Sequence, residues 1–343
     1  MAYTTVDNPG LFFNTKLWTG NDGSGHAITG VGFQPDFVWI KNRNTTDDHN
    51  LFDSVRGNTK TILSNSNAAE ATNTSRLESF DSDGITVGAD NDTNRNGDSI
   101  VGWNWKANGG TTSSNSNGSI TSTVQANTTA GFSIVSYTGT GSNATIGHGL
   151  SSAPSMIIFK TRGTGNWLVY HQGIGNTHGV FLNTTSAKDD DATYFQDTDP
   201  TSSVFSIGTS TLVNDTNAYI AYCFAEKKGY SKFESYTGNG NADGTFVYTG
   251  FRPAFVMIKG TASSRAWNIF DNKRDTFNPT DKLLLPNLSD AELSGYKIDF
   301  LANGFKPRDT NTYWNGNGET YIYMAFAENP FVTAGTKAPG TAR

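Results

Sequence analysis

The sequence is poor in the residues that cross-link small proteins or span membranes. Cys223 is the one cysteine in 343 residues, which excludes an internal disulfide framework and a cysteine-based zinc site. It lies in the apolar run 218–225, where we expect a buried, inert thiol. No apolar stretch approaches the roughly 18 residues of a membrane-spanning helix. The sequence therefore predicts neither disulfides nor membrane insertion.

Charge is also sparse. Charged residues make up 16% of the chain, the net charge is −6, and lysine and arginine form no basic cluster. Because binding to a phosphate backbone needs a basic face, nucleic acid is excluded as a partner. The N-terminal MAYTTVDNPG has neither a basic segment nor an apolar one, so we expect no secretory signal and folding in a reducing cytoplasm.

Hydrophobic residues reach only 35%, and the strong helix formers are scarce. In their place stand Asn, Thr, Ser and 37 Gly, which favour turns and strand ends. Aromatic residues at 12% can still fill small cores, because each ring removes a large apolar area from water. This composition predicts an all-β protein of many short strands joined by polar turns.

The strongest pattern is an internal repeat. The phrases WTGNDGS, YTGTGSN and YTGNGNA begin at Trp18, Tyr137 and Tyr236, and each leads to a turn, a proline and an apolar run ending in lysine. In every copy the proline lies 17 residues and the lysine 23 residues after the opening aromatic residue. Each copy closes on a further apolar run, IVGWNWKA, YIAYCFAE or YIYMAFAE. A register kept over these lengths predicts three tandem modules.

Each module, of about 100 residues, has the strand and turn pattern of a β-sandwich of jelly-roll type. We place the modules at residues 1–107, 130–228 and 229–332, with a linker at 108–129 and a C-terminal tail at 333–343. The Gly/Ser/Asn-rich part of the linker predicts flexibility, so that the first module moves relative to the others. Its SITSTVQA stretch alternates apolar and polar residues and predicts an added edge strand.

The apolar runs FVWI, MIIF and FVMI are continuous, which is typical of a strand buried on both faces. The proline before each run and the lysine after it indicate where the strand enters and leaves the core.

Long phrases of the chain resemble a repeat family of marine bacteriophages. They include HAITGVGFQPDFVWIKNR, ESFDSDGITVG, GYSKFESYTGNGNADGTFVYTGFRPAFVMIK and YIYMAFAENPF, and the similarity runs from Asp7 to Phe331. Members of that family are labelled virion structural or tail-fibre-like proteins. The resemblance implies a component of the virus particle and supplies no catalytic residues.

Motifs that carry chemistry are missing. The chain has no GxSxG elbow, HExxH zinc motif or P-loop, and its five histidines lack metal-ligand spacing, so no cofactor is expected. The better binding candidates are aromatic. Tyr313 and Trp314 stand among Asn and Gly in NTYWNGNGE, where exposed rings would stack on a sugar or pack against a partner chain.

One acidic loop resembles a calcium site. Asp92, Asn94, Asn96 and Asp98 alternate along DTNRNGD, as the first ligands of an oxygen-rich loop do. The twelfth position is Trp103, where a bidentate carboxylate would be needed. A polar hairpin turn is the competing interpretation, and the two stay open here.

Three functions are compatible with these features. The first is a non-enzymatic virion structural protein, exposed as a tail fibre, spike or other appendage. It would attach to the host surface, contact other virion proteins and form a homo-oligomer, with a trimer favoured by closed symmetry. The second is an array of carbohydrate-binding modules, with a head-decoration protein as a variant of the first. The third, a glycan-degrading spike enzyme, needs a carboxylate pair that no motif locates.

Overall fold

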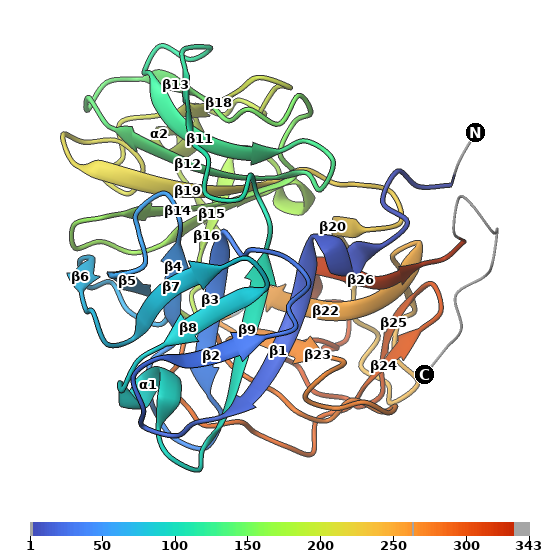
Figure 1. Ribbon diagram of the computed structural model, residues 1–343. Coiled ribbons are helices and arrows are strands. Elements are labelled where there is room, and N and C mark those ends of the chain that lie inside the picture. The colour runs from blue at the N-terminus through green and yellow to red at the C-terminus, as the bar shows by residue number, and fades with distance from the viewer. Residues whose placement is uncertain (1–2, 263, 333–343) are drawn as a thin grey trace.

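The computed structural model describes residues 3–262 and 264–332, and it is an all-β protein (Figure 1). Every pairing between its named strands is antiparallel, and its two α-helices, α1 (Asn91–Asn94) and α2 (Ala192–Phe195), are single turns. Two 3₁₀ turns, η1 (Pro9–Leu11) and η2 (Gln172–Ile174), complete the helical content of this part. The all-β prediction is confirmed. The tail at 333–343 lies outside the described residues.

Three large sheets form the frame. The first has the order β1 (Phe13–Thr19), β9 (Ser99–Trp105), β3 (Phe37–Asn42), β4 (Asn50–Asp53), β5 (Lys60–Leu63), β6 (Ala71–Thr72). The second has the order β10 (Ser113–Asn115), β11 (Ser122–Asn127), β12 (Phe132–Thr138), β19 (Ala218–Phe224), β14 (Met156–Thr161), β15 (Leu168–His171), β16 (His178–Phe181), β17 (Asp189–Asp190). The third has the order β20 (Ser231–Thr237), β26 (Thr320–Pro330), β22 (Phe251–Gly260), β23 (Trp267–Asp271).

The strand order is alike in the three sheets. In each, the strand that opens the module pairs with the strand that closes it, and the closing strand pairs with the proline-to-lysine strand. A small sheet accompanies each large one: β2 (His26–Thr29), β8 (Gly84–Val87) and β7 (Leu77–Asp81); β13 (Ala144–Gly147) and β18 (Val204–Ile207); β21 (Val247–Tyr248), β25 (Gly304–Pro307) and β24 (Ile298–Leu301). Side chains of each large sheet and its small sheet share one apolar cluster, which is the layering of a β-sandwich.

The other face of each large sheet contributes to a fourth cluster that all three modules share. Along β3, Val38 and Ile40 belong to the module's own cluster, whereas Phe37 and Trp39 belong to the shared one. The same alternation holds along β14 and β22. Successive side chains of a strand point to opposite faces, so a continuous apolar run is what two buried faces require. The prediction of burial on both faces is confirmed.

Trp105 lies at the centre of this shared core. Its indole is 1% exposed, and its ring centroid lies 4.9–6.4 Å from five aromatic rings. These rings come from all three modules and are Phe13, Phe37, Phe224, Phe255 and Phe326. The expectation of a first module that moves relative to the others is therefore wrong, because its inner face is part of the common core.

Backbone contacts close the modules into a ring. The N–H of Glu70 in the first module donates to the carbonyl of Arg162 in the second, at 2.9 Å. Lys188 of the second donates in the same way to Thr261 of the third, at 2.9 Å. Glu292 of the third then donates to Arg43 of the first, at 2.8 Å. Each module thus reaches into the next, and the third reaches back to the first. We call the three boundaries between modules that these contacts cross the seams.

Partly buried ion pairs reinforce two seams. Glu70 forms a bidentate contact with Arg162, at 2.9 and 2.7 Å, and Glu292 makes the same contact with Arg43. Although burial alone would raise the pKa of Glu70, Arg162 and Arg56 hold it below its ordinary value. The Glu70 and Glu292 side chains are only 9% and 11% exposed, so loss of the arginine partner would leave a largely covered carboxylate without its ion pair, which is unfavourable.

Residues 108–129 hold strands of their own. Ser122–Asn127 form β11, which pairs with β12, and β10 pairs with β11 and forms the edge of the second large sheet. The predicted strand is present, but β10 takes the edge position. At the start of the segment, the Asp36 carboxylate accepts backbone N–H groups from Ala107, Gly109 and Gly110, at 2.7–2.9 Å. The segment is therefore tied to the first module and to the second sheet.

The shared core predicts a single cooperative unfolding transition. Trp105→Ala should lower the free energy of unfolding by about 3–5 kcal/mol, because it opens a cavity among rings from three modules. Calorimetry and denaturant titration would measure this, with Leu11→Ala, at a site 47% exposed, as the control that changes little. Separate transitions, of which Trp105→Ala moves only one, would contradict the shared core.

Candidate functional site

The aromatic tip at Tyr313 and Trp314 is divided between surface and core. Trp314 is fully buried, and the expectation that it is exposed is wrong. Its indole N–H donates to Asp309 Oδ1 at 2.9 Å, and its ring meets Phe270 and Tyr296 edge-on at 5.4 Å. The Asn- and Gly-rich surroundings do form a turn, but the turn folds the indole inward, where the carboxylate satisfies its one donor.

Tyr313 stays at the surface. Its side chain is 39% exposed, and the Arg265 guanidinium lies 5.9 Å from its ring centroid. Of the two predicted contact residues, Tyr313 alone lies at the surface.

Three of the four predicted calcium ligands, Asp92, Asn94 and Asp98, have side chains occupied by protein groups. Asp92 pairs with Arg76 at 2.7 Å, and Asp98 accepts from Asn42 Nδ2 at 2.8 Å. The Asn94 side chain donates to the carbonyls of Gly23 and Gly88. Asn96 contacts the loop after β1 through its backbone, whose N–H donates to Asp22 Oδ1 at 2.9 Å.

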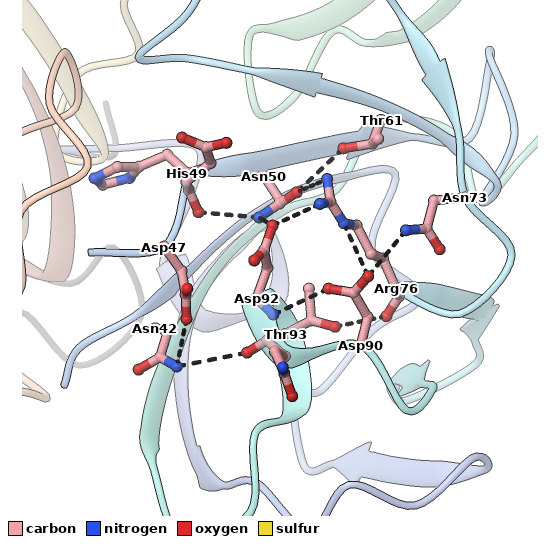
Figure 2. A network of polar contacts seen from close by, with 12 residues as sticks. Asn42, Asp47, His49, Asn50, Thr61, Asn73, Arg76, Asp90, Asp92 and Thr93 are labelled. Atoms are coloured by element: carbon pink, nitrogen blue, oxygen red, sulfur yellow. Dashed lines mark hydrogen bonds and ion pairs between the residues drawn. The ribbon is translucent and has the colours of Figure 1, made fainter. Parts of the chain in front are cut away.

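Figure 2 shows the polar network around Arg76 in the first module, which joins two loops to β4. The guanidinium contacts Asp90, Asp92 and the Asn50 side-chain oxygen. Burial raises the pKa of Asp92, although Arg76 opposes the shift. Within residues 3–262 and 264–332, no group of three or more His, Cys, Asp or Glu side chains is placed to hold a metal. The network is best suited to fixing the loops in place.

Asn94 has counterparts in the other modules. Asn214 and Asn315, like Asn94, are fully buried, and each uses its amide to join the loop after the opening strand to the loop before the closing strand. In the second module the loop after the opening strand passes very close to the loop before the closing strand. A Cβ on Gly139 would lie 2.1 Å from the Asp215 carbonyl oxygen. This explains the glycine in the repeated Thr-Gly pair, since no side chain fits there.

The lysines near the ends of the three proline-to-lysine strands, β3, β14 and β22, are buried, not exposed. We call these three the central strands. Lys41, Lys160 and Lys259 are each 0% exposed. Each ammonium donates to the carbonyl of the following residue and to a carbonyl of the next hairpin, at 2.7–3.1 Å. Burial lowers the pKa of each to about 8. The sequence interpretation that these lysines leave the core is wrong, although their constant offset was a signal of a shared role.

The exposed large apolar side chains gather on the third module. Five of the six among the described residues belong to it. They are Phe246, Tyr248, Phe277, Leu288 and Tyr313; the sixth is Leu11. The described helices are single turns, and none is long and apolar enough to cross a membrane.

The buried lysines predict a pH dependence. Because the folded pKa of about 8 lies below the unfolded value, the unfolded chain binds more protons between pH 8 and 10.5, and stability rises with pH in that window. Between pH 8 and 9, the increase in the free energy of unfolding per pH unit should be about 1 kcal/mol smaller in Lys160→Met than in the unchanged protein. Denaturant titration at several pH values would measure it. Lys188→Met, at an exposed position, should keep the wild-type slope, and equal slopes in all three proteins would contradict the prediction.

The occupied loop predicts no calcium response. Millimolar Ca²⁺ or EDTA should change the melting temperature by less than about 1 °C, since a ligand stabilises only the state that binds it. Differential scanning fluorimetry would test this. A rise with Ca²⁺ concentration that Asp92→Asn abolishes would show that the loop opens to the ion.

Comparison with known proteins gives one match. The comparison with curated proteins and that with solved structures each find none. A family model described as "Domain of unknown function (DUF7483)" matches residues 8–330 and so spans all three modules of the ring. The chain therefore belongs to the DUF7483 family.

Proposed function

We propose that this chain is a non-enzymatic structural protein of a bacteriophage particle, exposed on a tail fibre, spike or other appendage, where it contacts the host surface. The observation that carries the proposal is the gathering of exposed apolar side chains on the third module. Single exposed apolar residues are ordinary, but a bias to one of three modules with like strand orders favours a contact surface there.

The ring supports such a role because it is stiff. The inner faces of three sheets are packed together, and the seams fix each module against the next. Contact residues carried on a scaffold of this kind lose little freedom on binding, which favours affinity. The virion setting, with other virion proteins as partners and synthesis in the host cytoplasm, rests on the resemblance of the repeat phrases. A trimeric assembly stays a prediction.

The proposal makes two linked expectations. Mass spectrometry of purified particles should find the protein, and the purified protein should compete with particles for adsorption to host cells. Tyr248 is 54% exposed. If its aromatic side chain is a central contact, Tyr248→Ser should weaken the competition for adsorption by about tenfold.

Leu11→Ser is the matched control, because Leu11 is 47% exposed on the first module. It should compete as well as the unchanged protein. Absence from particles would refute the virion setting, and equal competition by Tyr248→Ser and Leu11→Ser would refute the contact surface on the third module.

A further inference from the structure

The three seams can be compared at one position, the residue that follows the last residue of β4, β15 or β23. These residues are Ser54, Gln172 and Asn272. The backbone N–H of each donates to a carbonyl at the start of the central strand, at 2.8–2.9 Å. The chain therefore holds three versions of the same corner, which serve as internal controls for one another.

At two of these corners the side chain bonds across the seam. Ser54 donates to Gln125 Oε1 at 3.0 Å, and Gln172 donates its amide to the Phe233 carbonyl. Asn272 is different. It is 1% exposed, and neither its oxygen nor its nitrogen has a hydrogen-bond partner among the described residues.

Asn272 lines a cavity of about 180 Å³ between the third module and β1 of the first, which we call the seam cavity. Thr15, on β1, lines it too, and its hydroxyl is a second buried group with no partner in the described part of the chain. Ala254 forms part of the wall and occupies the place that Asp36 takes in the first module. The short alanine side chain leaves room where the aspartate is bonded to three backbone N–H groups.

A second hollow of about 310 Å³ adjoins the seam cavity and shares Asn14, Thr15 and Lys273 with it. The seam cavity therefore has a second hollow beside it along β1. A bound molecule could place one unit inside and extend into the second hollow.

Buried amide and hydroxyl groups without partners are unfavourable, so native proteins hold few of them. An apolar residue at position 272 would remove the penalty if packing were the only role. The side chains of Ser54 and Gln172 are hydrogen-bonded at their corners and the Asn272 amide is not, and this contrast points to a ligand.

We propose that the seam cavity binds the terminal sugar of a glycan. An asparagine amide offers donors on one atom and an acceptor on the other, which suits two neighbouring hydroxyls that each donate and accept. The Thr15 hydroxyl supplies a third polar contact, while Phe13 and Ala327 give apolar walls for the ring carbons. The volume equals that of about six waters, which suits a single pyranose ring.

The charges of the lining favour a neutral ligand. Of the charged lining residues, Lys273 is exposed, and Glu328 pairs with Arg252 at 3.0 Å. This inference does not rest on the virion proposal, since the cavity belongs to the fold and would bind the same sugar in any setting.

Saturation-transfer NMR and calorimetry with glucose, galactose, mannose and N-acetylglucosamine would test the proposal on the full chain. At least one sugar should bind saturably at millimolar concentration. Asn272→Ala should weaken it by at least about tenfold, the factor expected for lost hydrogen bonds in a dry site. Thr15→Val, which keeps the shape of the side chain, should weaken it as well. Methyl glycosides of the bound sugar would distinguish two kinds of site. A site for the end of a glycan should still bind the methyl glycoside, whereas a site for the free monosaccharide should not.

Gln172→Ala is the matched control. It should leave sugar binding unchanged but lower the melting temperature, because it breaks a bond across a seam. Asn272→Leu, which keeps most of the side-chain volume, should not lower it, because the amide has no protein partner to lose. No saturable binding by any of the four sugars, unchanged binding in Asn272→Ala, or a fall in the melting temperature of Asn272→Leu equal to that of Gln172→Ala would each overturn the proposal.

Discussion

The packing of three apolar sheet faces around Trp105 is the constraint on which the rest of this structure depends. A β-sandwich usually keeps one face of each sheet in water, whereas here the large sheets are covered on both faces. That arrangement explains how a chain with only 35% hydrophobic residues reaches a large core. Its apolar residues are concentrated in the central strands, and both faces of those strands are used.

The seams follow from this packing. Once three sheets share a core, their ends must meet, and polar groups at those ends lose water. At the first seam Tyr222 donates to Asp53 Oδ2 at 2.7 Å, and at the third Trp103 donates to Asp271 Oδ2 at 3.1 Å. At the middle seam a neutral His171 contacts the Tyr323 carbonyl at 3.0 Å, and burial lowers its pKa to about 4. Two seams thus use a charged carboxylate and the middle seam uses a neutral imidazole to hydrogen-bond polar groups that the packing removes from water.

Much of the fold could be predicted from local pattern, because strand burial and turns are encoded within a few residues. The runs FVWI, MIIF and FVMI indicated two buried faces, but a run cannot say whether its second cover is its own module or a neighbour. Ring closure depends on contacts such as Glu292 with Arg43, which are 249 residues apart. The site was harder still. Trp314 stands in a polar turn, and only the position of Asp309 in space shows why the indole points inward.

The pairing of opening and closing strands has a consequence for how such a chain can be rearranged. Because β1 pairs with β9, β12 with β19 and β20 with β26, each module begins and ends at the same place. The two ends of the described chain also meet, with the Tyr3 hydroxyl on the Gly250 carbonyl at 2.6 Å and its ring 6.4 Å from that of Phe331. A ring with this connectivity has no physically preferred first module. Genes that start at the second or third module and rejoin the old ends would encode the same contacts, so circular permutation is open to this architecture.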